Sequence, residues 1–161
     1  MTVQPPRRAP EITLLMDLAQ GLVALALRSL DAAQGKVNLA QFRALRVLNE
    51  MGPCKSGALA TALQLHPSTV TRLGDRLLAA GFVTRTVKPD NRREVELDIT
   101  RAGRQVVDAV LTFRTRELEA VVAHMSPAAA EQLRDVLPAL VVAQHRQDAL
   151  HDLPGATPPL T

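Results

Sequence analysis

Aromatic residues are scarce in this chain of 161 residues, which holds three Phe and neither Trp nor Tyr. A core with so few rings must be filled by Leu, Val and Ala, which favours packed helices over aromatic-rich β-sandwiches. The scarcity also argues against a site for single-stranded nucleic acid, because such sites stack bases on aromatic side chains.

Cysteine and long apolar runs are scarce as well. The single cysteine, Cys54, cannot form an intrachain disulfide, so nothing requires an oxidising compartment. The sequence has no uninterrupted apolar run of about eighteen residues, and its start, MTVQPPRRAP, lacks the pattern of a secretory signal. We therefore expect a cytoplasmic protein without a membrane partner.

Catalytic and metal-binding patterns are also missing. The sequence shows no nucleophile–base–orienter set, glycine-rich phosphate loop or carboxylate pair. No paired Cys/His spacing occurs, and the histidines are scattered. The sequence therefore predicts no enzyme, no metal site and no cofactor. The four histidines are His66, His124, His145 and His151.

Positive charge gathers in the middle of the chain. Residues 55–104 contain nine Lys or Arg against five Asp or Glu, whereas the rest of the chain carries ten against eleven. A basic middle between near-neutral flanks suggests a polyanionic partner, although a solvated basic surface gives the same count.

Helical periodicity covers both sides of this basic segment. Leu15, Leu18, Leu22 and Leu25 form a seam in a helix predicted over residues 12–30. Asn38 is expected to cap a second helix that ends at 52–53, and shorter helices follow over 57–63 and 67–80.

The period changes after the fourth helix. Residues 83–87 form an extended run, and residues 95–99 alternate apolar with charged side chains, which predicts a two-stranded hairpin with a basic tip. Thr100 then caps a long helix to about residue 124, and Ser126 with Pro127 starts a final helix. Pro138 is expected to kink this helix or split it in two.

The helix predicted from residue 67 has two contrasting faces. At 100° per residue, five residues share one apolar arc that can pack on the preceding helices. The opposite arc carries hydroxyl and guanidinium groups, which bond to base edges and phosphates. The apolar arc contains Val70, Leu73, Gly74, Leu77 and Leu78.

Two short helices joined by residues 64–66 form a candidate helix-turn-helix. The first turn of its second helix would enter the major groove, where Arg72 is suited to a bidentate contact with guanine. An ordinary surface helix with its polar residues facing outward would show the same pattern of apolar and polar faces. The hairpin that follows at once favours the DNA-binding interpretation, because Arg92 and Arg93 at its tip can reach a minor groove.

At this point the chain resembles the MarR family of winged helix-turn-helix regulators. The matching stretch is LATALQLHPSTVTRLGDRLLAAGFVTRTVKPDNRREVELDITRAG, residues 59–103. It contains the family's P-S-x-V-[ST]-R-x-x-D-R-L recognition helix, its G-[LF]-V-x-R run and its closing [LI]-T-x-x-G. Its wing tip departs from the family's D-R-R, because Asn91 stands at the Asp position and Asp90 comes one place earlier. Either Asp90 orients Arg93 instead, or the wing is less rigid.

The resemblance covers about residues 11–150 and implies a mainly α fold, with a two-stranded β wing and long helices that form a dimerisation region. Residues 37–100 would be the DNA-binding domain, and 11–36 with 101–152 the dimerisation region. The ends, 1–10 and 153–161, have compositions typical of disorder. The implied DNA contacts are Pro67, Ser68, Thr69, Thr71, Arg72 and Arg76 in the recognition helix, and Asp90, Asn91, Arg92 and Arg93 in the wing.

The resemblance also implies a function. The chain would be a transcriptional regulator, a repressor by expectation, that binds a pseudo-palindromic operator in double-stranded DNA as a homodimer. Many relatives are released by a small aromatic or phenolic effector, and Phe42 and Arg46 lie near the expected pocket, although core and surface roles fit them too. The alternative is a winged-helix module for protein contacts without specific DNA readout.

Two residues invite narrower interpretations. Lys55 beside Cys54 could lower the pKa of the thiol and so allow peroxide sensing, but a structural or incidental thiol is the preferred interpretation. Gly74 stands inside a helix where the family has a larger apolar residue, and we expect it to allow a close helix approach.

Overall fold

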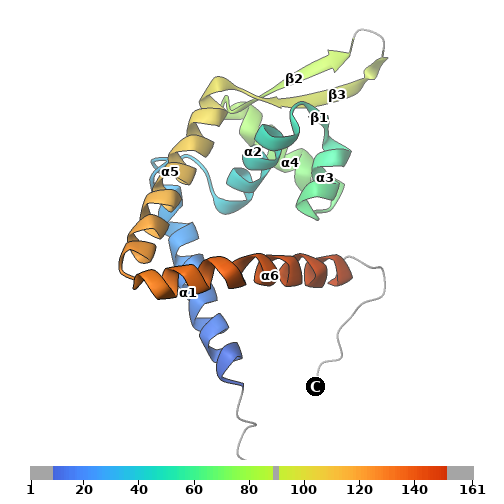
Figure 1. Cartoon of the computed structure of the whole chain (residues 1–161). Helices are drawn as coiled ribbons and strands as arrows, with labels where there is room; N and C mark the ends of the chain where they lie inside the picture. Colours follow the sequence, from blue (N-terminus) through green and yellow to red (C-terminus); the bar gives the residue numbers. More distant parts are fainter. Residues whose placement is uncertain (1–8, 89–90, 152–161) are drawn as a thin grey trace, which may run out of the picture. The chain divides into compact units, whose positions relative to one another are not determined.

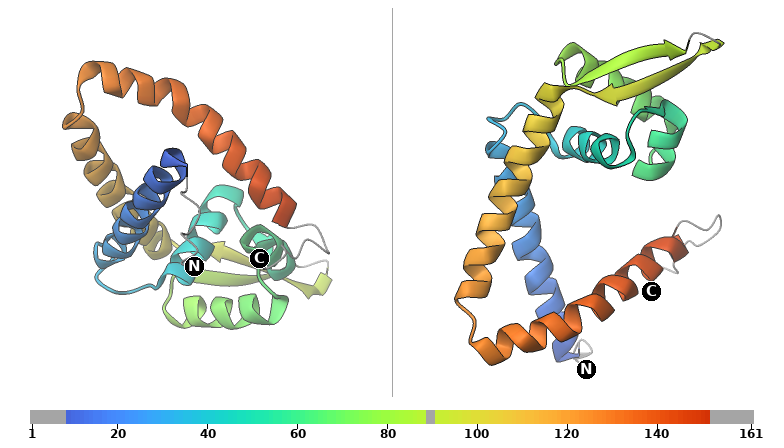
Figure 2. Two further views of the ribbon diagram at one scale, coloured as in Figure 1. Left: turned by 90° about the horizontal axis from the view of Figure 1, so that it is seen from below. Right: turned by 45° about the horizontal axis from the view of Figure 1, so that its top comes forward.

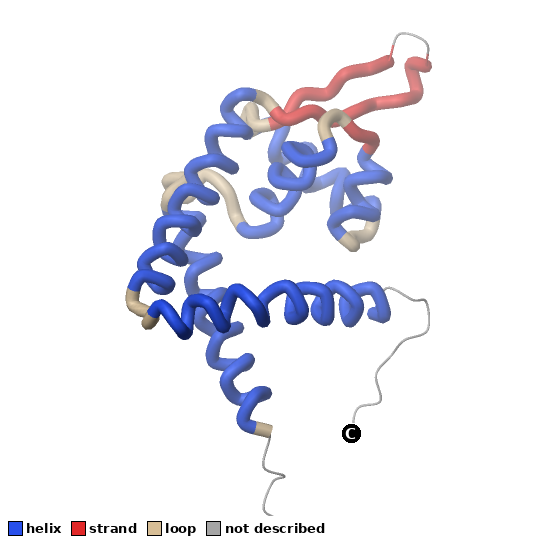
Figure 3. Tube along the Cα trace, in the orientation of Figure 1, coloured by secondary structure: helices blue, strands red, loops and turns tan. Residues whose placement is uncertain are grey.

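The computed structural model describes residues 9–88 and 91–151, where helices predominate and one small sheet lies among them (Figures 1 and 3). This confirms the predicted fold class. The predicted disordered ends lie outside the described residues, except for Ala9 and Pro10: Ala9 precedes the first helix and Pro10 begins it. The elements are α1 (Pro10–Asp31), α2 (Leu39–Met51), β1 (Cys54–Lys55), α3 (Ser56–Leu63), α4 (Pro67–Ala79), β2 (Val83–Lys88), β3 (Asn91–Ile99), α5 (Arg101–Ala123) and α6 (Pro127–His151).

Side-chain caps begin three of the helices where the sequence predicts them. Asn38 accepts a bond from the Gln41 amide at 3.0 Å, and the Gln41 side chain accepts one from the Asn38 amide at 2.9 Å, which completes a capping box. The Thr100 hydroxyl accepts from the Gly103 amide at 3.1 Å, and the Ser126 hydroxyl accepts from the Ala129 amide at 3.2 Å. Each such cap typically stabilises a helix by about 1 kcal/mol.

The sheet has three antiparallel strands in the order β1–β3–β2. In the hairpin Val83 pairs with Ile99 and Val87 with Val95, as the alternating pattern predicts. The third strand was not predicted: Cys54 of β1 pairs with Leu97 and Lys55 with Glu96. Two residues are too few to show a period of two, so β1 leaves no signal in the sequence.

The core lies where α2, α3, α4 and the start of α5 meet the sheet, and aliphatic side chains fill it. Leu45, Leu59 and Leu97 are almost completely buried, and Phe42 is the largest side chain among them. The predicted aliphatic core of a helical protein is therefore confirmed.

Helix α4 buries the predicted arc with one exception. Val70, Leu73, Gly74 and Leu77 are buried, but Leu78, at the edge of the arc, is exposed, so its assignment to the core was wrong. A β-carbon built on Gly74 would lie 3.3 Å from Cδ1 of Leu97 in β3. The glycine thus admits a strand side chain and not, as predicted, a neighbouring helix.

The first turn of α5 is fixed to the end of α4 and to the hairpin. The Thr100 amide donates to the Phe82 carbonyl at 2.9 Å, and the Thr100 hydroxyl donates to the Gly81 carbonyl at 2.8 Å. Arg104 donates to the Ile99 carbonyl at 2.9 Å. These bonds hold the base of the wing against the start of the long helix.

Helices α1 and α5 run side by side within residues 1–117, which form one of two compact units (Figure 2). Arg114 Nε donates to the Ser29 hydroxyl at 2.9 Å, and Ser29 is fully buried. By length and composition α1 is apolar enough to cross a membrane, although it contains no uninterrupted apolar run of that length. A helix that buries an apolar seam against a partner has the same composition, and α1 carries charges at Asp17 and Arg28.

The second unit, residues 118–161, contains α6. This helix is continuous from Pro127 to His151 with Pro138 inside it, so of the two predicted outcomes, a kink or a split, the split does not occur. Proline removes one backbone donor and crowds the preceding turn, but the strong helix formers around Pro138 continue the helix on both sides.

Candidate nucleic-acid interface

The turn between α3 and α4 is short and sharply defined. Gln64 adopts a left-handed conformation with φ of 57°, and the Leu65 amide donates to the Ala60 carbonyl at 3.0 Å. Arg43 reaches from α2 to the Leu63 carbonyl at 3.4 Å. Both interactions satisfy carbonyl groups at the end of α3, so α4 starts in a fixed direction.

His66 caps the N-terminus of α4. Its Nδ1 accepts from the Ser68 amide at 3.3 Å and lies 2.8 Å from the Ser68 hydroxyl. Pro67 occupies the first turn, where its missing N–H leaves no bond unmade. His66 is therefore a side-chain cap at the start of this helix.

The predicted reading residues of α4 lie opposite its buried arc. Pro67, Ser68, Thr71 and Arg72 are exposed, as is Arg76, whereas Thr69 is half-buried. The Thr71 hydroxyl donates to the Pro67 carbonyl at 3.1 Å, so without DNA it bonds within its own helix. Within the described ranges 9–88 and 91–151, neither Arg72 nor Arg76 takes part in an ion pair. Their two guanidinium groups are therefore available to a polyanion.

An ion pair that was not predicted connects α4 to the wing. Arg85 Nη2 of β2 lies 2.6 Å from Asp75 Oδ1 on α4. Both residues belong to motifs quoted above, Asp75 to the recognition-helix motif and Arg85 to the G-[LF]-V-x-R run. Their opposite charges in neighbouring elements are the signal that could have identified the pair.

The tip of the wing is only partly described. Asp90 lies outside the described residues, and so does its predicted contact with Arg93. The backbone of Asn91, Arg92 and Arg93 forms the start of β3, and Lys88 pairs with Asn91 across a register shift. Their side chains lie outside the described part of the structure.

Phe42 and Arg46, the predicted effector contacts, lie in different surroundings. The Phe42 ring is 1% exposed and has the Arg114 guanidinium 4.7 Å from its centroid. Arg46 is exposed and pairs with Glu50 at 2.8 Å. Burial, and secondly the charge of Arg46, lower the pKa of Arg114. Arg114 Nη2 is buried, with no hydrogen-bond partner in the part of the chain that is described.

Cys54 is buried, with only 8% of its surface exposed. Burial, and secondly the negative charge of Glu96, raise the pKa of its thiol. The alternative in which Lys55 lowers this pKa is therefore not supported, and the thiolate needed for oxidant sensing is disfavoured, which favours a structural or incidental thiol.

We expect native Cys54 to react with a disulfide reagent at about pH 8 at least tenfold more slowly than the urea-unfolded chain. The neutral thiol contributes stability that is complete below its ordinary pKa and declines as the pH rises from there to the raised native value. Stopped-flow absorbance with dithionitrobenzoate measures both rates. Equal rates in the two states would show that the thiol is accessible and activated.

Among the described residues, no group of three or more His, Cys, Asp or Glu side chains is placed to hold a metal ion.

Comparisons with known proteins identify the family. Residues 37–95 match the model of the MarR family. The chain is 32% identical over 108 residues to the HTH-type transcriptional regulator Mb0904 of Mycobacterium bovis, covering 65% of this chain and 76% of that protein. Two regulators from Bacillus subtilis match over shorter segments, and this chain spans about half of their length, 53% of one and 48% of the other.

Solved structures match over a longer range. RV1404 from Mycobacterium tuberculosis has a TM-score of 0.74 and 31% identity, covering 86% of this chain and 97% of that one. A mutant of MepR from Staphylococcus aureus, bound to an oligodeoxyribonucleotide, has a TM-score of 0.68 at 19% identity, covering 85% and 99%. At 19% identity, the likeness to MepR concerns the fold alone. Together with the helix-turn-helix, the wing and the matched family segment, these relatives show that the chain belongs to the MarR family of helix-turn-helix transcriptional regulators.

Proposed function

We propose that this regulator binds a pseudo-palindromic operator in double-stranded DNA as a homodimer and represses transcription in the cytoplasm. The observation that carries the proposal is the exposed polar face of α4 beside a β hairpin, on which Arg72 and Arg76 make no ion pair with any described residue. The structure of MepR with an oligodeoxyribonucleotide supports it, because that protein has the same fold.

Each protomer would read one half-site. The first turn of α4 would contact bases and phosphates through Ser68, Thr69, Thr71 and Arg72, with Arg76 nearby on a phosphate. Contacts by Ser68 and Thr71 require their hydroxyls to leave the local bonds that they make without DNA. Asp90, Asn91, Arg92 and Arg93 of the wing would meet the adjacent minor groove.

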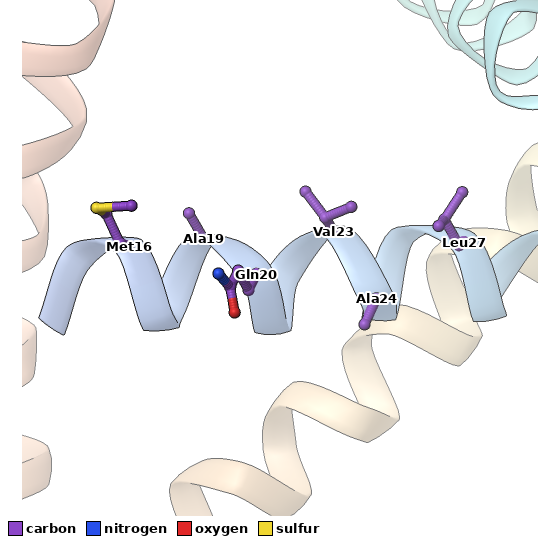
Figure 4. A pocket seen from close by; sticks show the side chains of 6 residues that line it. All are labelled: Met16, Ala19, Gln20, Val23, Ala24 and Leu27. Carbon is purple, nitrogen blue, oxygen red and sulfur yellow. The ribbon is translucent and has the colours of Figure 1, made fainter. Parts of the chain in front are cut away.

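Dimerisation is proposed for residues 11–36 and 101–152. Met16, Ala19, Val23 and Leu27 follow one side of α1 and line an apolar groove (Figure 4). Leu18 and Leu22 on the same helix are about half exposed. A single soluble chain rarely leaves so much continuous apolar surface uncovered, which favours a second copy as the partner. A monomer in sedimentation equilibrium at micromolar concentration would contradict this.

An anionic aromatic effector is proposed near Phe42, Arg46 and Arg114. The supporting observation is that Arg114 Nη2 is buried beside the Phe42 ring without a hydrogen-bond partner in the described structure. Burial, and secondly the positive charge of Arg46, lower the pKa of Arg114. A carboxylate would satisfy that group and neutralise the repulsion. Titration with simple aromatic carboxylates tests this: release of bound DNA is expected, and no change with any of them would contradict it.

The experiment that tests DNA binding is fluorescence anisotropy with DNA from upstream of the gene and with random duplex, over a series of salt concentrations. We expect affinity for the specific duplex to be about 10³-fold or more higher, and to fall steeply with salt. Equal weak binding to the upstream duplex, to other candidate operators and to random DNA would favour the alternative of a protein-contact module.

Arg72→Ala is expected to weaken binding to the operator by about 1–3 kcal/mol and to relax preference at one base position. The reason is the loss of a bidentate contact from an exposed arginine near the start of the recognition helix. Anisotropy with operator variants measures the preference. An equal loss on operator and random duplex would show that Arg72 contacts only phosphate.

A further inference from the structure

We propose that Asp75 and Arg85 are a specificity-determining pair, in which the carboxylate positions the base of the wing against the recognition helix and keeps the Arg85 cation off the DNA. The inference deepens the DNA-binding function proposed above and rests on it. It assigns roles to two residues that are not among the predicted DNA contacts.

The geometry of the pair connects the two parts that would read DNA. Asp75 lies one helical turn after Arg72 and is adjacent to Arg76, so it shares the exposed face of α4. Arg85 lies in β2, opposite Leu97 of β3. Its Nη2 atom is 2.6 Å from Asp75 Oδ1, a short charge-assisted hydrogen bond. The pair therefore bridges helix and wing directly.

Gly74 leaves room for this bridge. A β-carbon at Gly74 would lie 3.3 Å from Leu97 Cδ1 and 3.9 Å from Arg85 Nη2. The added β-carbon would be tight against the Leu97 side chain and in ordinary van der Waals contact with the guanidinium group, so side chains larger than alanine have little room there. The Arg85 side chain is 35% exposed, so it lies partly against the protein and has less freedom than a typical surface arginine.

The charges explain why such a pair affects specificity more than affinity. Unpaired Asp75 would repel phosphates on the face that carries Arg72 and Arg76, and unpaired Arg85 would attract any phosphate regardless of sequence. Pairing cancels both effects. The pair then acts only by fixing the position of the wing relative to α4. This position affects binding when the wing and α4 must fit the same DNA half-site, as they would on the operator.

Asp75→Asn is the variant that tests the pair. Freed Arg85 should tighten binding to random duplex and make the salt slope steeper by about 0.9, because one more cation meets phosphate. The ratio of operator affinity to random affinity should fall about fivefold, because the wing is held less firmly. Arg85→Gln should lower the same ratio while weakening binding to random duplex. The double variant should lose no more discrimination than either single variant.

A matched control separates position from charge. Asp98→Asn removes the same charge from β3, and Asp98 makes no ion pair within residues 9–88 and 91–151. It should leave the ratio of operator to random affinity unchanged. If Asp75→Asn also leaves this ratio unchanged, or lowers both affinities equally, the proposal is overturned.

Hydrogen exchange without DNA tests the pair independently of the proposed function. Asp75→Asn should increase exchange at the amides of β2 by several-fold and leave α2 unchanged, whereas Asp98→Asn should change neither. Unchanged exchange in β2 would overturn the positioning role. Wild-type protein that fails to discriminate operator from random duplex would instead overturn the proposed DNA-binding function.

Discussion

Gly103→Ala is expected to lower the free energy of unfolding by about 3 kcal/mol. A β-carbon at this position would lie 2.3 Å from the Phe82 carbonyl oxygen and 2.7 Å from Ile99 Cγ1. Both distances are far shorter than van der Waals contact, so the backbone must move.

The neighbours of Gly103 have little freedom to make room. The Phe82 carbonyl accepts a hydrogen bond from the Thr100 amide at 2.9 Å, and the Phe82 amide donates one to the Leu77 carbonyl at 2.9 Å. Ile99 is 2% exposed and paired with Val83 in the hairpin. Moving any of these groups breaks hydrogen bonds or opens the core, and this explains the large expected loss.

Urea unfolding at one fixed protein concentration measures the effect, because subunit association would otherwise change the apparent stability. Gly57→Ala is the matched control: Gly57 lies in α3 with no atom within 4 Å of an added β-carbon. Alanine there should stabilise the protein by up to about 1 kcal/mol. If the two variants have equal stability, the close approach at Gly103 is not a constraint.

The sequence predicted the local features of the fold well, because these depend on neighbours in the chain. The capping box at Asn38 and the caps at Thr100 and Ser126 each require only residues three positions apart. The buried arc of α4 follows from helical spacing alone. Leu78, at the edge of the arc, is exposed, because burial at the edge depends on which elements pack against the helix and not on helical spacing.

Features that depend on distant residues could not be predicted in the same way. Gly103 is part of a recognisable motif, but the need for glycine comes from the Phe82 carbonyl, which lies in the distant turn between α4 and β2. The strand β1 exists only because β3 offers an edge to pair with. At Pro138 the local rule left two outcomes open, a kink or a split, and the helix continues through the proline without splitting.

The candidate site divides along the same line. The exposed side of α4 was predictable from its pattern, but the bonds of Ser68 and Thr71 to their own turn were not. The Asp75–Arg85 pair joins two motifs that were identified separately. Arg114 was not singled out, because nothing in the sequence places an arginine of α5 over the ring of Phe42 in α2.

Phe42→Ala is expected to lower the free energy of unfolding by about 4 kcal/mol. The ring is 1% exposed, and Phe82 is the one other phenylalanine in the cluster of buried core residues, so mainly aliphatic side chains surround the cavity that truncation would leave. Truncation also removes the surface beneath the Arg114 guanidinium, which lies 4.7 Å from the ring centroid. Urea unfolding at fixed protein concentration measures the loss, and Leu39→Ala, at an exposed position of α2, should change stability by less than about 0.5 kcal/mol.

Phe42→Leu separates the core role of this residue from an effector role. Leucine retains most of the apolar volume, so this variant should lose clearly less stability than Phe42→Ala while lacking an aromatic face. If an aromatic carboxylate that releases wild-type protein from DNA still releases Phe42→Leu equally well, Phe42 is a core residue alone. If release is weakened while DNA affinity and stability remain close to wild type, the ring also contacts the effector. A loss of less than about 1 kcal/mol in Phe42→Ala would contradict the central position of this ring in the core.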